Sequence, residues 1–252
     1  MTERRAIVTG ASSGIGRAIA LELARRGMDV VGSARRAASL DDARSSQGGG
    51  HLHPYQADLT DPSAVRDLFE YARNEIGPVD TVIHSVGHEY PIALLARSDR
   101  TAVPGAIAAL ITSPALVLAE ALAQFEDVRG GRVILVSSGA AFRALPGRAL
   151  YSMAKAAVNQ LVRSAAAEVA ARPTIAVAAI LPGRVDTPMQ RRLVETAKTA
   201  DASLGLSEFR SMDGVSQAED VAAAVGDLVD HEPSALNGHI FRYAAGGWSI
   251  VE

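Results

Sequence analysis

The strongest constraint on the fold is the regular alternation of short apolar runs with longer helical patterns. The runs are almost continuously apolar, which is typical of parallel strands buried on both faces. We expect strands at residues 6–8, 29–31, 53–56, 82–84, 133–136, 175–180 and 239–243, and helices at 15–26, 63–76, 104–125, 151–171 and 218–229. This order predicts an α/β fold with a doubly wound parallel sheet, in one domain spanning residues 1–252.

A glycine cluster separates the first expected strand from the first expected helix. It reads Gly10-Ala11-Ser12-Ser13-Gly14-Ile15-Gly16. Glycines at such a turn let the backbone approach a pyrophosphate, and the following helix N-terminus offers free N–H groups and a positive dipole. A purely structural turn is the alternative, because the spacing differs from the commoner G-x-G-x-x-G. The strand before it and the helix after it favour a dinucleotide site formed by Gly10, Ser12, Ser13, Gly14, Ile15 and Gly16.

Other candidate residues also follow strand ends. Asp58, Gly87, Ser138 and Pro182-Gly183 each come shortly after an expected strand. The carboxyl ends of parallel strands meet at one edge of a sheet, and ligands bind there. Turn chemistry alone explains Gly87, but it does not explain the polar set that begins at Ser138.

Tyr151 and Lys155 complete that set. They are four residues apart on an expected helix, so both side chains lie on one face, ~6 Å apart along the axis. An ammonium beside a phenol favours the phenolate and makes the pair a plausible acid–base unit. The chain has 25 basic residues, yet only Lys155 and Lys198 are lysines. This bias suggests that a lysine is chemically required at position 155.

Together these motifs resemble the short-chain dehydrogenase/reductase family over nearly the whole chain. The matching segments are Thr9 to Gly16, Asp58-Leu59, Ser138, Tyr151-Ser152-Met153-Ala154-Lys155 and Pro182 to Thr187. The resemblance implies a Rossmann-type fold with about seven parallel strands, and hydride transfer between a nicotinamide cofactor and a carbonyl. It implies that Tyr151 is the general acid, Ser138 orients the carbonyl and Lys155 binds the nicotinamide ribose. It further implies cofactor contacts from Asp58, Leu59, Gly87, Tyr151, Lys155, Pro182, Gly183, Val185 and Thr187.

Two positions depart from the family pattern. His84-Ser85-Val86-Gly87 stands where the family usually has Asn-Asn-Ala-Gly, and Leu110 (or Ala109 in the other register) stands where it usually has a catalytic asparagine. Leucine cannot hydrogen-bond through its side chain, so a proton path through that position is in doubt. His84, His88 or Glu89 could replace it. Two interpretations stay open: an active reductase, and a weak or inactive relative that binds NADP(H) for regulation or for a partner.

The end of the second strand bears on cofactor choice. NAD-binding members of the family usually carry an acidic residue there for the ribose 2′-hydroxyl. This chain has Ala34 at that position, followed by Arg35. A guanidinium suits a 2′-phosphate, so we expect NADP(H) over NAD(H). The alternative is an ordinary solvated arginine.

The sequence gives less information about the substrate than about the cofactor. Residues placed by position to line a pocket are His88, Tyr90, Ala140, Phe142, Arg148, Met189 and Trp248, and residues 187–216 are the expected lid. A free ketone, a sugar and a polyketide are equally compatible. Arg129 and Arg172 lie where related reductases dock an acyl carrier protein, which is a further alternative.

Composition limits the other partners. A net charge of −3 and a pI of about 6.1 argue against nucleic acid or an anionic membrane as a partner. The chain has no cysteine, and we expect no metal site. The apolar stretch 102–123 contains Pro104, Gly105 and Glu120, which favours a buried or subunit-interface helix over a membrane span. Without a signal-peptide pattern we expect a cytoplasmic homo-oligomer, a tetramer first and a dimer second.

Overall fold

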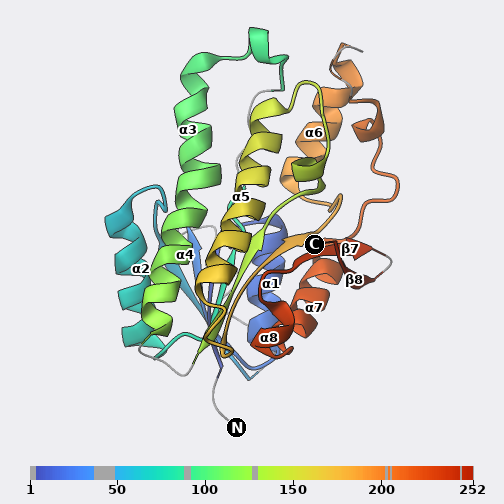
Figure 1. Ribbon diagram of the computed structural model, residues 1–252. Helices are drawn as coiled ribbons and strands as arrows, with labels where there is room; N and C mark the ends of the chain where they lie inside the picture. The colour runs from blue at the N-terminus through green and yellow to red at the C-terminus, as the bar shows by residue number, and fades with distance from the viewer. Residues whose placement is uncertain are drawn as a thin grey trace.

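The computed structural model describes residues 4–36, 49–87, 92–126, 130–201, 204, 206–244 and 246–251. One sheet runs through the molecule in the order β3-β2-β1-β4-β5-β6-β7-β8 (Figure 1). The strands are β1 Arg5–Thr9, β2 Asp29–Ala34, β3 Leu52–Gln56, β4 Thr81–His84, β5 Gly131–Val136, β6 Ile175–Leu181, β7 Ile240–Ala244 and β8 Gly247–Ile250. Strands β1 to β7 pair in parallel, which confirms the predicted doubly wound α/β fold.

The eighth strand corrects the expected number of about seven. Strand β8 pairs antiparallel with β7 and closes one edge of the sheet. It is four residues long and mostly exposed, and it contains Gly247 and Ser249. A short edge strand that buries little has no apolar run to reveal it in the sequence.

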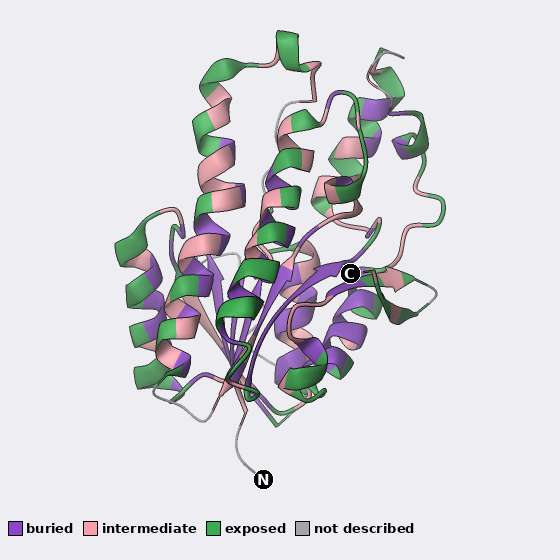
Figure 2. Cartoon of the chain, in the orientation of Figure 1, coloured by how far each residue is buried: buried purple, intermediate pink, exposed green. Residues whose placement is uncertain are grey.

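Helices cover both faces of this sheet. The long ones are α1 Gly14–Arg25, α2 Pro62–Glu75, α4 Ser113–Phe125, α5 Ala149–Glu168, α6 Pro188–Thr199 and α7 Ala218–Val229; α3 Val103–Ile107 and α8 Pro233–Leu236 are short. One core lies between the sheet and α1 with α7, and the other between the sheet and α2, α4 and α5 (Figure 1). The strands between these layers are the most buried part of the chain (Figure 2).

The expected helix 104–125 is interrupted. Between α3 and α4, residues Ala108–Thr112 form a π turn. Pro114 has no N–H to offer the carbonyl of Leu110 four residues earlier, which explains why the regular ladder breaks here. Ser113 donates instead to the Ala109 carbonyl at 3.0 Å. In the described part of the chain, Arg100–Phe125 is long and apolar enough to cross a membrane, by length and composition only.

The described part of the segment expected as a lid has more regular structure than its mixed sequence suggests. It contains α6 and a 3-10 turn, Ser207–Phe209. Thr187 caps α6 by accepting from the Gln190 N–H at 3.1 Å, and Pro188 occupies the first turn. Ala197, Leu206 and Phe209 form a separate small core there. The Thr187-Pro188 pair is a helix-start signal that the sequence reading missed.

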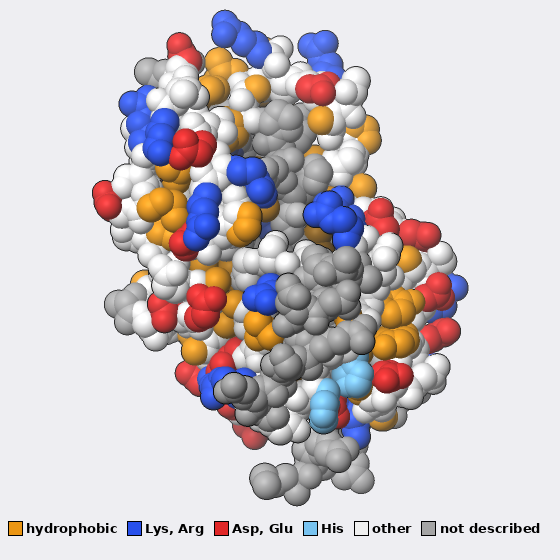
Figure 3. Space-filling view, turned by 180° about the vertical axis from the view of Figure 1, so that it is seen from behind, with side chains coloured by type: hydrophobic (Ala, Val, Ile, Leu, Met, Phe, Trp, Pro, Cys, Tyr) orange, Lys and Arg blue, Asp and Glu red, His pale blue; other side chains and the backbone are white. Residues whose placement is uncertain are grey.

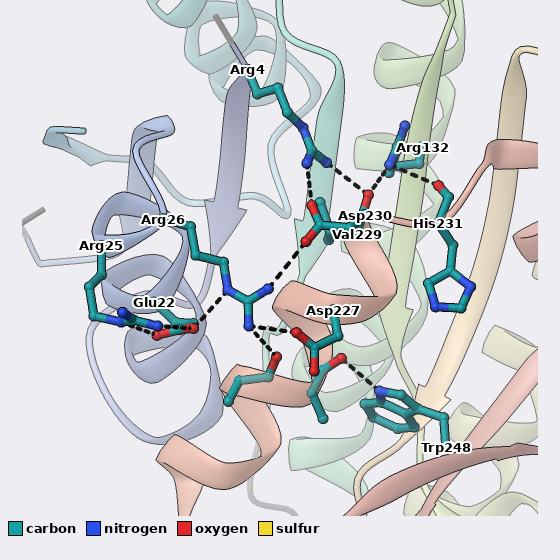
Figure 4. A network of polar contacts seen from close by, with 12 residues as sticks. Arg4, Glu22, Arg25, Arg26, Arg132, Asp227, Val229, Asp230, His231 and Trp248 are labelled. Carbon is teal, nitrogen blue, oxygen red and sulfur yellow. Dashed lines mark hydrogen bonds and ion pairs between the residues drawn. The ribbon is translucent and has the colours of Figure 1, made fainter. Parts of the chain in front are cut away.

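Arg26, at the end of α1 away from the glycine turn, joins α1 to α7. Arg26 donates to Glu22 at 2.8 Å and to Asp227 at 2.8 Å, and it also reaches Asp230 at 3.2 Å (Figure 4). A Cβ at Gly226 would lie 2.5 Å from the guanidinium carbon of Arg26. A larger side chain at position 226 would therefore displace the Arg26 guanidinium from its present position against α7.

Charged side chains of both signs are mixed on the face seen in Figure 3, with apolar side chains between them. Among the described residues visible on that face, no large region carries one sign alone. Such a surface does not produce the broad field that attracts a polyanion.

Candidate active site

The glycine turn after β1 is shaped for close contact with a phosphate. Gly10 and Gly14 have φ of +69° and +56°, in the left-handed region. A Cβ at Gly10 would lie 2.6 Å from the Ser85 carbonyl oxygen, and one at Gly16 would lie 2.4 Å from the Gly10 carbonyl oxygen. The Ser13 side chain makes no capping bond at the start of α1. The helix therefore presents free N–H groups and its positive end to a ligand.

The segment after β6 lies beside this turn. A Cβ at Gly14 would come within 3.0 Å of the Thr187 methyl group. Val185 is buried and bridges to Ser216, Pro182 is buried, and Gly183 has φ +76°. The structure thus brings Thr187 against the glycine turn, as expected for two parts of one cofactor site.

The remaining expected cofactor residues lie at neighbouring strand ends. Asp58 is exposed after β3 and accepts from the Thr60 N–H at 3.1 Å, whereas Leu59 is buried. Arg35 is exposed directly after β2. Ser12 and Ile15 are half-buried, and Ile15 packs on the α1 core. The polar surface and the bent backbone along this edge fit a dinucleotide.

Lys155 is held by the strand that precedes Ser138. Its side chain is 5% exposed, and Nζ donates to the Val136 carbonyl at 2.8 Å. Nζ lies 5.8 Å from the centroid of the Tyr151 ring. Burial lowers the pKa of Lys155, and the charge interaction with Tyr151 opposes this effect. Ser138 begins the 3-10 turn Gly139–Phe142, and its hydroxyl accepts from the Ala140 N–H at 3.2 Å.

A buried pair behind Lys155 was not anticipated. Ser137 donates to the Asn159 side-chain oxygen at 2.6 Å and also approaches the Lys155 carbonyl at 3.3 Å. Both residues are at most 3% exposed. Asn159 is four residues after Lys155, so the sequence did place it on the same helix face. The pair fixes α5 against the end of β5 and thereby positions Lys155.

His84 sits in a second buried cluster. Nδ1 lies 2.9 Å from the Thr9 hydroxyl and Nε2 lies 3.2 Å from the Ser113 hydroxyl. Burial, with the nearby charge of Lys155 as a smaller effect, lowers the pKa of His84 to about 3. A neutral imidazole here joins β1, β4 and the start of α4. Leu110, in the π turn, is 2% exposed.

The expected substrate residues lie in different places. Arg148 lies against Tyr151, with its guanidinium carbon 4.4 Å from the ring centroid; Ala140 is buried and Phe142 is 40% exposed. Met189 covers Gly87, because a Cβ there would meet its terminal methyl at 2.6 Å. Trp248 is a correction: it donates to the Ala224 carbonyl at 2.8 Å and packs with the α1 and α7 core. The residues that lie outside the described part of the chain are His88, Glu89, Tyr90 and Arg129.

Comparison with known proteins identifies the family. A family model described as short chain dehydrogenase matches residues 4–198. Cis-4-hydroxycyclohexanecarboxylate dehydrogenase of Sinomonas cyclohexanicum is 34% identical over 250 residues, covering 99% of this chain and 98% of its own. The 3-oxoacyl-[acyl-carrier-protein] reductase FabG of Escherichia coli (strain K12) is 29% identical over 248 residues, 97% of each chain. The chain belongs to the short-chain dehydrogenase/reductase family and is an oxidoreductase of that family.

A solved structure agrees on the fold. A variant of actinorhodin polyketide ketoreductase, determined with NADPH, superposes with a TM-score of 0.85 over 97% of both chains at 22% identity. The layered architecture described above is therefore shared with a ketoreductase.

Proposed function

We propose that the chain is an NADPH-dependent ketoreductase that converts a carbonyl substrate to an alcohol. The observation that carries this proposal is Lys155, buried to 5% exposure, tethered to Val136 at 2.8 Å and placed 5.8 Å from the Tyr151 ring. Burying an amine is costly, and a structural role would be served more cheaply by an apolar residue. The arrangement is the one that the family's chemistry requires.

The residues of the site then have the following roles in the proposed reaction. A bound nicotinamide dinucleotide supplies the hydride that the carbonyl carbon receives. Ser138 donates a hydrogen bond to the carbonyl oxygen, and Tyr151 gives that oxygen its proton as the alkoxide develops. Lys155 would hold the ribose of the bound cofactor, and its positive charge attracts the negative charge that develops on Tyr151. The glycine turn, Asp58, Thr187 and the backbone around Gly183 hold the rest of the cofactor.

The preference for NADP(H) rests on Arg35. It is exposed at the end of β2, where a ribose 2′-phosphate would lie, and Ala34 beside it is buried and carries no charge. Two structural neighbours were solved with NADPH or NADP, which adds support for a nicotinamide cofactor of this kind. A guanidinium and a phosphate attract each other, whereas an acidic residue would exclude the phosphate.

The described residues also support a lid. Met189 of α6 lies over Gly87, and Phe209 lies 5.4 Å from the guanidinium of Arg148. Residues 187–216 thus reach both the cofactor edge and the substrate side. We propose that this segment closes over the substrate. Docking of an acyl carrier protein has less support, because Arg172 already donates to the Phe125 carbonyl at 2.9 Å.

A second function is favoured by Leu110 and His84. Both are buried; Leu110 has no polar side-chain atom, and burial lowers the pKa of His84 to about 3, so its imidazole is neutral near pH 7. A weak or inactive relative that binds NADP(H) for a regulatory or partner-binding role would show these features. The intact Ser138, Tyr151 and Lys155 favour the enzyme.

One experiment separates the two functions. NADPH oxidation at 340 nm is followed with a panel of ring and chain ketones, sugars and 3-oxoacyl thioesters, and NADPH binding is measured in parallel by titration. We expect substrate-dependent oxidation with at least one class. Tight NADPH binding without turnover on any class would favour the binding role.

A further inference from the structure

Arg148 joins the proposed general acid to the segment that covers it. Its guanidinium carbon lies 4.4 Å from the centroid of the Tyr151 ring and 5.4 Å from that of Phe209. Phe209 is 6% exposed and belongs to the 3-10 turn Ser207–Phe209. Arg148 itself is half-buried at the start of α5, three residues before Tyr151. The cation therefore lies directly beside the side chain proposed as the general acid.

The neighbouring arginines have partners of their own. Arg143 donates to Glu208 at 2.7 Å, and Arg184 donates to the Asp213 carbonyl at 3.1 Å. Within the described residues, no carboxylate lies at ion-pair distance from Arg148. Burial lowers the pKa of Arg148, while Tyr151 and the more distant Glu208 oppose this effect. The guanidinium remains charged, since an arginine is not deprotonated in proteins.

A half-buried charge with no carboxylate beside it among the described residues is costly to the free protein. An anionic ligand at that position offsets the cost, because the planar fork of a guanidinium binds a carboxylate through two parallel hydrogen bonds. A neutral ketone would bring no negative charge to offset the positive charge of Arg148. The site is thus built for a substrate that brings its own negative charge.

We propose that Arg148 binds a carboxylate on the substrate, so that the substrate is an oxo acid and not a neutral ketone. This inference rests on the proposed reductase function for its turnover readout only. Its main competitor is a role for Arg148 through Tyr151 alone, in which the cation stabilises the phenolate. That role would lower the rate equally for charged and uncharged substrates.

Matched substrates distinguish the two roles. We compare 4-oxocyclohexanecarboxylate and levulinate with their methyl esters, in the wild type and in Arg148→Gln. A charge-assisted contact predicts that the wild type prefers each acid over its ester by about 10- to 100-fold in kcat/KM, mainly through KM. Arg148→Gln should lose the preference because it slows the acids about 10- to 100-fold more than the esters. Equal rates of acid and ester in the wild type, or equal loss of both in the variant, would overturn the proposal.

Two further variants control for the fold and for general charge. Arg143→Gln removes an exposed arginine of the same loop and should keep the acid preference. Arg148→Lys keeps the positive charge but not the planar guanidinium, and it should keep part of the preference for the acids. Melting temperatures of all variants are measured beside the kinetics, and equal rates of acid and ester in the wild type would overturn the proposal even if Arg148→Gln fails to fold.

A binding measurement makes the inference independent of turnover. Calorimetric titration of the wild type with NADP present should show that cyclohexanecarboxylate binds at least about tenfold more tightly than cyclohexanecarboxamide, and Arg148→Gln should abolish the difference. If Arg148 discriminates the two probes in this way but no ketone is reduced, the carboxylate site is supported and the proposed reductase function is rejected. Equal binding of the two probes to the wild type would reject the carboxylate site whatever the enzyme reduces.

Discussion

At the scale of single residues, the site depends on a few polar groups removed from water. Lys155 is buried beside the Tyr151 ring, and its main described partner is a backbone carbonyl, that of Val136. A carbonyl leaves the positive charge of the ammonium uncompensated. That charge therefore acts on Tyr151 and on whatever ligand approaches it.

Replacing the phenol tests the proposed acid. Tyr151→Phe removes the proton donor and keeps the ring on which Arg148 and Lys155 pack. We expect kcat to fall by about 10²–10⁴-fold, while the Kd for NADPH is nearly unchanged. Stopped-flow kinetics and fluorescence titration measure the two quantities. Wild-type turnover in this variant would exclude Tyr151 as the acid.

Cofactor choice is tested at Arg35. The charge-assisted contact expected with a 2′-phosphate contributes roughly 1.5–3 kcal/mol, or about 10- to 100-fold in affinity. We expect NADPH to bind more tightly than NADH, and Arg35→Asp to erase or reverse the difference. Titration of both cofactors into both proteins is the measurement. Equal wild-type affinities would place Arg35 outside the site.

His84 makes the folded state sensitive to acid. Its pKa is about 3 in the folded protein against 6.5 in the unfolded chain. Between these values the unfolded chain holds a proton that the folded chain lacks, so stability falls as the pH falls. From pH 7 to pH 5 this group alone should cost about 2 kcal/mol. Urea unfolding of the wild type and of His84→Asn at both pH values measures this effect. The free energy of unfolding of His84→Asn should fall by about 2 kcal/mol less than that of the wild type between pH 7 and pH 5. An equal fall in the two proteins would show that His84 is not responsible.

At the scale of elements, the break before α4 is the most unusual feature. The π turn Ala108–Thr112 ends at Ser113, whose hydroxyl contacts both the Ala109 carbonyl and His84. Leu110 stands in this turn where the family usually has an asparagine; it is buried and lines a small apolar pocket with Leu150, Met153 and Ala154 of α5. We interpret this apolar residue and the neutral His84, which contacts Ser113 at the end of the turn, as one rebuilt unit.

That interpretation predicts the effect of restoring the asparagine. Leu110→Asn places a buried amide where the apolar surroundings offer it few hydrogen-bond partners. This costs about 1–3 kcal/mol of stability. We expect a lower melting temperature and no gain in kcat. Leu110→Met, which keeps the volume and the apolar character, should be nearly neutral by comparison. A faster and equally stable Leu110→Asn enzyme would instead show that the wild type is a partly disabled reductase.

The sequence predicted what periodicity and local spacing control. The strand ends, the glycine turn and the shared face of Tyr151 and Lys155 follow from such rules. The carbonyl that holds Lys155, the neighbours of His84 and the position of Arg148 over the Tyr151 ring depend on distances between segments far apart in the chain. Helix α6 was missed for another reason, because its polar, mixed composition hides a regular helix with a good start signal.

At the scale of the whole molecule, the helices on one face leave apolar surface uncovered. One third of the most apolar window in Arg100–Phe125 is buried within the chain, and Met153 of α5 is 44% exposed. Both α4 and α5 show exposed residues on their outer sides (Figure 2). Alanine-rich helices allow close approach of a second copy, and exposed apolar surface on two neighbouring helices favours an interface there.

We therefore expect a homotetramer in solution, with a dimer as the second choice. Ala119 is exposed on α4, so Ala119→Arg places a charge on the surface that we expect to be buried between subunits. Light scattering at micromolar concentration should give the mass of four chains for the wild type and a smaller mass for this variant. Ala235→Arg, at an exposed alanine of α8, is the matched control and should leave the mass unchanged. A monomeric wild type would contradict the prediction, and an unchanged mass in Ala119→Arg would place the interface on another face.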